Sequence, residues 1–217
     1  MIPAALPLMA TILKLLDLIN HAAAFLTGLI IYHFMEPQEY LTLFKRLELG
    51  VYFFCLKKYK STEQGYFMTQ AMQEFNHSKV FANILFPDSK YRLPKTDTYT
   101  TKKDEGTIYS ADGISKRYLT TRFFFSGKSA EEFDINNSLA FMGVLENFQY
   151  LVYLEVLKFI PSEYFRYLES IANEEKEHSD VLLGKVGQDL LIVKWNLKLL
   201  ISLPLIPVDL LFLKFPK

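Results

Sequence analysis

The tetrapeptides EFNH at residues 74–77 and EKEH at residues 175–178 share one pattern, a glutamate followed three residues later by a histidine. Residues three apart lie on the same face of an α-helix. Each tetrapeptide therefore predicts a carboxylate and an imidazole that can bind one metal ion together. A single match is weak, because composition alone gives roughly 0.3 matches in such a chain. Two matches in the same context are far stronger.

The context is a second glutamate upstream of each tetrapeptide, on a segment with helical spacing of apolar residues. Glu48 precedes Glu74 by 26 residues, and Glu146 precedes Glu175 by 29. Each pair is separated by about one helix and a short turn. We therefore expect two helical hairpins, each with one glutamate on its first helix and Glu-x-x-His on its second.

Helix signals define four core helices, at residues 37–60, 61–85, 129–159 and 163–186. Pro37 stands where a helix favours its first residue. Ser61 with Gln64 and Ser129 with Glu132 have the spacing of a capping box, which predicts that helices begin there. Pro161 and the residue after it predict a tight turn before the fourth helix.

The inward face of each core helix is predicted from apolar residues at helical spacing. Besides the glutamates and histidines, the predicted stripes contain Leu41, Phe44, Val51, Tyr52, Cys55 and Tyr59, then Phe67, Gln70, Ala71, Phe81 and Leu85, then Leu139, Met142, Tyr150, Tyr153 and Leu157, and finally Tyr164, Leu168, Ile171 and Leu182.

Residues 86–128 lose the periodicity and read as a long connection, with a hairpin expected at residues 98–110. Two helical hairpins joined by one long crossover have the connectivity of a four-helix bundle of the ferritin-like type. The fold class expected is therefore all-α, with core residues 37–186 and extra helices at residues 1–35 and 187–217.

Six polar groups set in apolar stripes are costly to bury unless they are paired or bind cations. Glu48, Glu74, Glu146 and Glu175 supply four negative charges, which balance two divalent metal ions. His77 and His178 add one nitrogen ligand for each ion. Mixed oxygen and nitrogen ligands suit iron or manganese. We expect two iron ions as the cofactor, with manganese as the alternative metal.

The chain resembles the ferritin-like superfamily, and within it most closely the rubrerythrin-type di-iron branch. The motif of that branch is a glutamate, six residues, a tyrosine and then Glu-x-x-His, occurring twice. The second copy is complete with Tyr153, whereas Cys55 stands at the tyrosine position of the first copy. The rubredoxin-like cysteine pairs of full rubrerythrins are missing, since Cys55 is the one cysteine.

The resemblance implies an oxidoreductase that activates dioxygen or peroxide at two irons and receives electrons from an external donor. It implies that Glu74 and Glu175 bridge the irons, that Glu48 and Glu146 are terminal or bridging ligands, and that each histidine binds one iron. Tyr150 and Tyr153 are the candidate catalytic residues, as hydrogen-bond or electron donors. The alternative is that both tyrosines are ordinary core residues. An apolar organic substrate fits the apolar ends of the chain.

Two other functions remain open. One is iron oxidation and storage, or peroxide detoxification, without an organic substrate. Iron storage would require an oligomer that forms a cage. The other is a helical binding or scaffold protein without metal. Metal content separates the scaffold protein from both of the metal-binding functions.

Length and composition set further bounds. A chain of 217 residues with half of them apolar fits one domain. A net charge of zero makes nucleic acid an unexpected partner. The single cysteine excludes an internal disulfide framework and fits a cytoplasmic location. The apolar ends read as helices packed on the bundle, with contact at a membrane surface as the sharper alternative. A homodimer is also among the expected partners.

Three residues serve as comparisons for the metal ligands. Glu155 is expected on the opposite side of its helix from Glu146, exposed to solvent. His21 and His33 have no glutamate at the metal-binding spacing, and we expect ordinary helix histidines there.

Overall fold

The computed structural model describes residues 5–85 and 132–205, and every regular element within these two ranges is a helix. The elements are α1 (Ala5–Phe34), α2 (Pro37–Thr62), α3 (Gly65–Leu85), α5 (Ile135–Val156), α6 (Ser162–Lys185), α7 (Asp189–Ser202) and the short 3-10 helix η3 (Leu203–Leu205). The all-α prediction is confirmed for these residues. The predicted crossover at 86–128, with its hairpin at 98–110, lies outside them.

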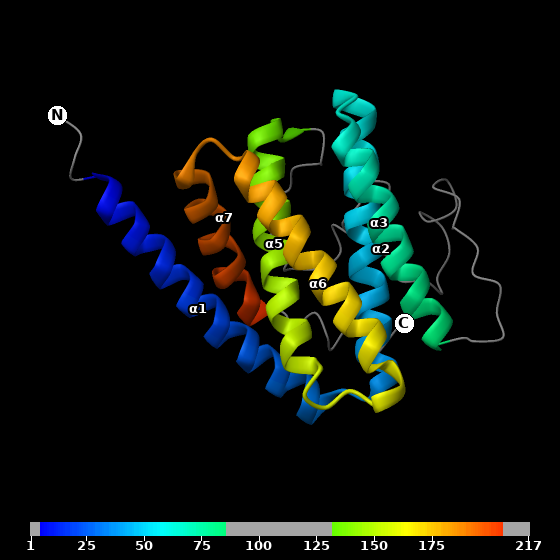
Figure 1. The fold of residues 1–217 in the computed structure, drawn as a ribbon. Coiled ribbons are helices and arrows are strands. Elements are labelled where there is room, and N and C mark those ends of the chain that lie inside the picture. Colours follow the sequence, from blue (N-terminus) through cyan, green and yellow to red (C-terminus); the bar gives the residue numbers. More distant parts are fainter. Residues whose placement is uncertain (1–4, 86–131, 206–217) are drawn as a thin grey trace. The chain divides into compact units, whose positions relative to one another are not determined.

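These helices divide into two compact units (Figure 1). Among the described residues, unit 1 contains 5–35 and 134–203, and therefore α1, α5, α6 and α7. Unit 2 contains 36–85, 132–133 and 204–205, and therefore α2 and α3. The single ferritin-like domain stays a prediction, and each unit is described by itself.

Unit 2 is a helical hairpin in which α2 packs along α3 (Figure 1). Its first helix begins as the sequence predicted, with Pro37 at the first position. The backbone N–H of Glu36 donates to Glu39 Oε2 at 2.9 Å, which satisfies a group that the helix start leaves unpaired. The rings of Phe44 and Phe81 lie with centroids 5.7 Å apart and tie the middle of α2 to α3.

The predicted helix start at Ser61 is wrong. Ser61 lies in the last turn of α2, where its hydroxyl and that of Thr62 donate to the carbonyl of Lys58 at 3.1 and 2.7 Å. The chain turns at Glu63, which adopts a left-handed conformation with φ 57° and ends the helix. The Ser61–Gln64 spacing failed because these hydroxyls bond backward along α2 and leave the start of α3 to Gly65.

Unit 1 is built on the α5–α6 hairpin, to which α1 and α7 add (Figure 1). The predicted start of the third core helix is also wrong, because α5 begins at Ile135 and not near residue 129. Asp134 is the N-cap, and its carboxylate accepts from Asn137 N at 2.7 Å. Glu132 lies before this cap, and Ser129 lies outside the described residues.

A glycine sets the close approach of α5 and α6. A Cβ at Gly143 would stand 2.7 Å from the side chain of Leu183 on α6. Next to it, Ser179 Oγ donates to the Gly143 carbonyl at 2.8 Å. This contact fixes the register of the hairpin, because Gly143 is one turn before Glu146 and Ser179 follows His178 directly.

Gly143→Ala is expected to destabilise the protein by about 1–3 kcal/mol, because the added methyl group forces α5 and α6 apart. The matched control is Gly184→Ala on α6, where a Cβ would meet nothing within 4 Å. That change is expected to be neutral or to stabilise by up to about 1 kcal/mol through helix propensity. Urea unfolding followed by circular dichroism measures both. Equal effects of the two substitutions would contradict the close approach.

The helices α1 and α7 are held to the hairpin and to each other by polar contacts. Asn20 Nδ2 donates to Asn196 Oδ1 at 2.6 Å, between α1 and α7. Trp195 Nε1 donates to Asn137 Oδ1 at 3.2 Å, between α7 and α5. Gly28 allows α1 to approach Glu155 of α5 closely. A Cβ added at Gly28 would lie 2.6 Å from the Cβ of Glu155.

Most of the residues predicted to face inward are buried, and a minority are only half-buried. Within the described residues the stripes of all four core helices follow the predicted spacing. The residues predicted inward that are only half-buried are Tyr59, Leu85, Tyr150, Leu157 and Tyr164. Each lies toward an end of its helix or beside its stripe, where fewer neighbours cover the side chain.

One helix of the described residues, at Pro7–Phe34, is long and apolar enough to cross a membrane. A packed core helix and a signal sequence meet the same test of length and composition. The polar residues Lys14, Asp17, Asn20 and His21 all lie within this helix.

Candidate metal centre

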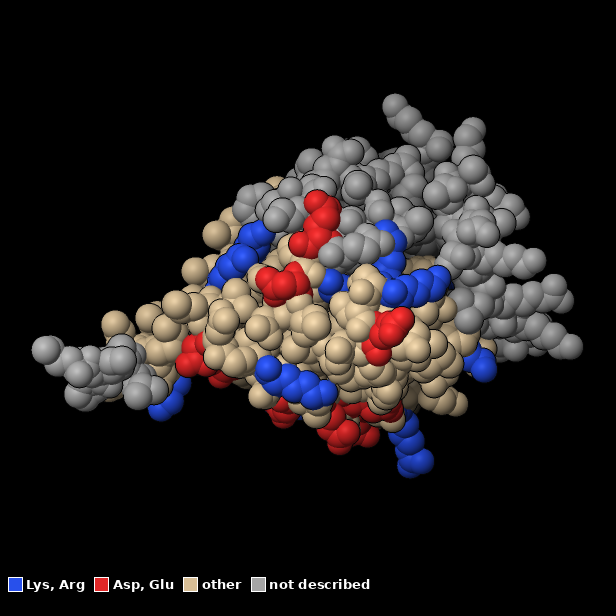
Figure 2. Space-filling model, turned by 90° about the horizontal axis from the view of Figure 1, so that it is seen from above, with Lys and Arg blue, Asp and Glu red and all other residues tan. Residues whose placement is uncertain are grey.

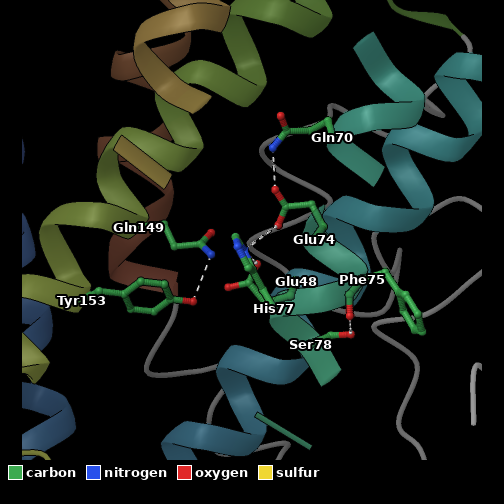
Figure 3. A network of polar contacts seen from close by, with 8 residues as sticks. All are labelled: Glu48, Gln70, Glu74, Phe75, His77, Ser78, Gln149 and Tyr153. Atoms are coloured by element: carbon green, nitrogen blue, oxygen red, sulfur yellow. Dashed lines mark hydrogen bonds and ion pairs between the residues drawn. The ribbon is translucent and has the colours of Figure 1, made fainter. Parts of the chain in front are cut away.

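In unit 2, Glu48 from α2 and the Glu-x-x-His pair from α3 form one cluster, termed here triad A (Glu48, Glu74, His77). His77 Nδ1 lies 3.6 Å from Glu48 Oε2 and 3.8 Å from Glu74 Oε2 (Figure 3). One ligand atom of each residue lies within 4.8 Å of the other two. All three side chains are buried, and both carboxylates are fully so.

A buried glutamine orients one carboxylate of triad A. Gln70 Nε2 donates to Glu74 Oε1 at 2.5 Å from one turn earlier on α3 (Figure 3). Because this bond engages Oε1, Oε2 is the oxygen that faces His77. Sequence reading placed Gln70 on the inward stripe but missed its contact; its position four residues before Glu74 was the available signal.

Unit 1 contains the matching cluster, triad B (Glu146, Glu175, His178). Glu146 projects from α5, and the other two residues project from α6. Here too, one ligand atom of each residue lies within 4.8 Å of the others. Both carboxylates are fully buried and His178 is nearly so. The contact between Gly143 and Leu183 holds the two helices close enough for this approach.

The two candidate catalytic tyrosines differ in their surroundings. Tyr153 is fully buried on α5, and its hydroxyl accepts from Gln149 Nε2 at 3.0 Å (Figure 3). The phenol proton of Tyr153 can then be donated elsewhere. Tyr150 is only half-buried. Cys55, at the position that matches Tyr153 in unit 2, is fully buried. Sequence reading did not identify Gln149, which lies three residues after Glu146.

Two further tyrosines of unit 2 are held in the neutral form. Burial raises the pKa of the Tyr52 phenol above its ordinary value of 10.0, and it does the same for Tyr66. The Tyr52 ring packs against Phe75 with centroids 5.7 Å apart. Burial therefore disfavours the phenolate form of both side chains.

The donor types in each triad fit a divalent metal ion. Two carboxylates and one imidazole provide hard oxygen and intermediate nitrogen ligands, which suit iron or manganese. Water cannot solvate carboxylates as deeply buried as these, so a cation is the group that would best offset their charge. The two triads thus have the same three residue types, and in both units these residues project from helices and are buried.

The comparison residues behave differently from the triads. His21 is exposed, and its Nδ1 lies 2.9 Å from the Asp17 carbonyl oxygen. His33 is also exposed. The expectation for Glu155 is wrong, because its side chain is only 21 % exposed and pairs with Lys158. The close approach of Gly28 covers it.

No protein-family model, curated protein or solved structure gives a significant match to this chain.

Proposed function

We propose that the α2–α3 and α5–α6 hairpins are the four core helices of a ferritin-like bundle in which triads A and B form one two-metal site. In this proposal the protein is a di-iron carboxylate oxidoreductase that activates dioxygen or peroxide and oxidises an apolar organic substrate. Manganese is the alternative metal.

The observation that carries the proposal is the duplication of the triad. Each hairpin buries two carboxylates and one histidine whose ligand atoms lie within 4.8 Å of one another. A single cluster of this kind would be weak support, since buried acidic groups occur for other reasons. Two clusters with the same composition and the same helix order match the arrangement that ferritin-like di-metal proteins use.

Each ligand has a separate task in the proposed site. His77 and His178 would each bind one metal, on the faces of α3 and α6. Glu74 and Glu175, one turn away from them, and Glu48 and Glu146 on the preceding helices would supply the carboxylate ligands. The Gln70 bond to Glu74 Oε1 favours binding through Oε2, because it fixes the plane of that carboxylate.

Two ferrous ions held in this way would supply the electrons that reduce dioxygen or peroxide. The protein would bury the reaction away from water, since all four carboxylates are inaccessible to solvent. Tyr153 is the proposed hydrogen-bond or electron donor near the site, with Gln149 fixing the orientation of its hydroxyl. An external donor would restore the ferrous state.

The test uses the full chain loaded anaerobically with ferrous iron and then exposed to oxygen, with ascorbate as the reductant. The small molecules retained by the purified protein are extracted before and after the exposure and compared by mass spectrometry. We expect an apolar compound that gains oxygen or loses hydrogen in proportion to the oxygen consumed. Oxidation of iron alone, with ferric iron accumulating far beyond two per chain, would indicate iron storage and contradict the substrate assignment.

A further inference from the structure

The outer face of α1 is apolar over the length of the helix. Leu18 is 67 % exposed, Leu26 is 58 % exposed and Phe25 is 48 % exposed. The other large apolar residues exposed on α1 are Leu8, Leu15, Ile19, Leu29, Tyr32 and Phe34. Only 28 % of the most apolar window of this helix is buried. Soluble monomers rarely expose a continuous apolar surface of this length.

These residues gather on one side of α1, opposite the side that packs on α5 and α7. The buried positions Leu16, Asn20 and Ala24 follow each other at about one-turn spacing, and Ile31 lies two turns further along the same side. Apart from Phe34 at the end of the helix, the exposed apolar residues fall on the other side, within an arc of roughly 140°. One face of α1 therefore belongs to the core of unit 1, and the other faces outward.

The outer face carries almost no charge. Lys14 and Asp17 are the only Lys, Arg, Asp or Glu residues in α1, and from Leu18 to Met35 there are none. The neighbouring α7 continues the apolar character with Leu190, Leu197 and Ile201, all exposed. A lipid surface tolerates such a wide uncharged face, because acyl chains solvate apolar side chains in any arrangement.

A second helix fits this face less well. With Ala22 between them, Leu15, Leu18, Phe25 and Leu29 do have the three-and-four spacing of a coiled-coil seam. The residues flanking such a seam are usually charged and set the partner and its register. Here Leu26 flanks it, as does Ile19, so the apolar surface is wider than one helix covers.

A helix that crosses the bilayer is also a poor fit. α1 is held lengthwise in unit 1 by the Asn20–Asn196 hydrogen bond and by the ring contact between Tyr32 and Phe159 at 5.1 Å. Crossing would carry the Glu155–Lys158 ion pair, beside Gly28, into hydrocarbon. Charged groups at that depth cost several kcal/mol. Contact from the side keeps them in the aqueous phase.

We propose that α1 lies in the plane of a lipid bilayer surface, with its outer face in the boundary between headgroups and acyl chains. The attraction is hydrophobic and not electrostatic. Figure 2 shows Lys and Arg side chains interspersed with uncharged residues over one face of the described part, and acidic side chains gathered along its lower edge. The net charge of the chain is zero.

The test is flotation of the metal-free protein with phosphatidylcholine vesicles, so that it does not depend on the two-metal site. We expect the protein to float with the vesicles at low salt and equally at about 1 M NaCl, where the Debye length is about 3 Å. Leu18→Glu with Phe25→Glu should weaken the partitioning at least about tenfold, because both carboxylates must leave water. Leu15→Glu with Leu26→Glu is a second variant with the same expectation.

The matched control is Val181→Glu with Tyr167→Glu, which places the same charges on exposed apolar positions of α6 in the same unit. It should float like the wild type, and circular dichroism should show that all variants keep the helical content. Failure of the wild type to float, or equal flotation of the outer-face variants, would overturn the proposal. A wild-type dimer that the outer-face variants dissociate, without vesicle binding, would assign the face to a second copy of the chain.

Discussion

Glu74→Ala combined with Glu175→Ala is expected to reduce the iron content of anaerobically loaded protein from about two ions per chain to nearly none. Each substitution removes one carboxylate from a triad of three ligands, Glu74 from triad A and Glu175 from triad B. Because the remaining glutamate and histidine of each triad cannot close a site, neither ion is retained. Iron is measured by elemental analysis after removal of unbound metal.

The control for this prediction is Glu169→Ala combined with Glu177→Ala. Both glutamates are exposed on α6, and their loss changes the net charge by the same amount. This variant should keep about two irons. Equal iron in the two double variants would mean that the buried carboxylates do not bind the metal.

The second large effect is on the free energy of unfolding. The buried carboxylates are expected to lower it when no metal is bound and to raise it when iron is bound. Ferrous iron at about 1,000 times its dissociation constant should stabilise the wild type by about 4 kcal/mol for each ion bound, or about 8 kcal/mol for two, because it binds only the folded state. Without iron, Glu74→Leu combined with Glu175→Leu should instead stabilise the protein by about 1–4 kcal/mol, because two buried carboxylates are replaced by apolar groups of similar volume.

Anaerobic thermal unfolding with and without ferrous iron measures both parts of this prediction. The leucine variant should unfold at a higher temperature than the metal-free wild type and should gain almost nothing from iron. A leucine variant that is less stable than the metal-free wild type would indicate that the carboxylates stabilise the core without a metal. An equal response of both proteins to iron would place the metal elsewhere.

The ligand positions were predictable from the sequence because helical geometry alone determines which residues share a face. In each triad the Glu-x-x-His pair shares one face of its helix, and the remaining glutamate lies in the apolar stripe of the preceding helix. The structure buries all six. That the triads bind a metal, and that they meet in one bundle, are still predictions.

The helix ends were less predictable, because several side chains can cap one end. At Ser61 the hydroxyl bonds backward to Lys58, and at the start of α5 the cap is Asp134 and not an upstream serine. Contacts between helices likewise could not be predicted from the spacing of apolar residues within one helix. Glu155 is covered because Gly28 of α1 approaches it, and no pattern within α5 reveals that approach.

The buried contacts of long polar side chains were also not predicted from the sequence. Lys58 is almost completely buried, and its ammonium donates to the Phe133 carbonyl, a residue far away in sequence. Gln70 and Gln149 lie one turn from Glu74 and Tyr153, so their contacts were geometrically available to prediction. Their burial depends on packing that residue type alone does not indicate.

The central claim is that triads A and B bind two metal ions. It is tested most directly by equilibrium dialysis of the wild type and of His77→Ala and His178→Ala against ferrous iron without oxygen. The proposal predicts about two irons per chain for the wild type and about one for each histidine variant, since each variant disables one triad. A wild type that binds no more iron than the Glu74→Ala and Glu175→Ala double variant would contradict it.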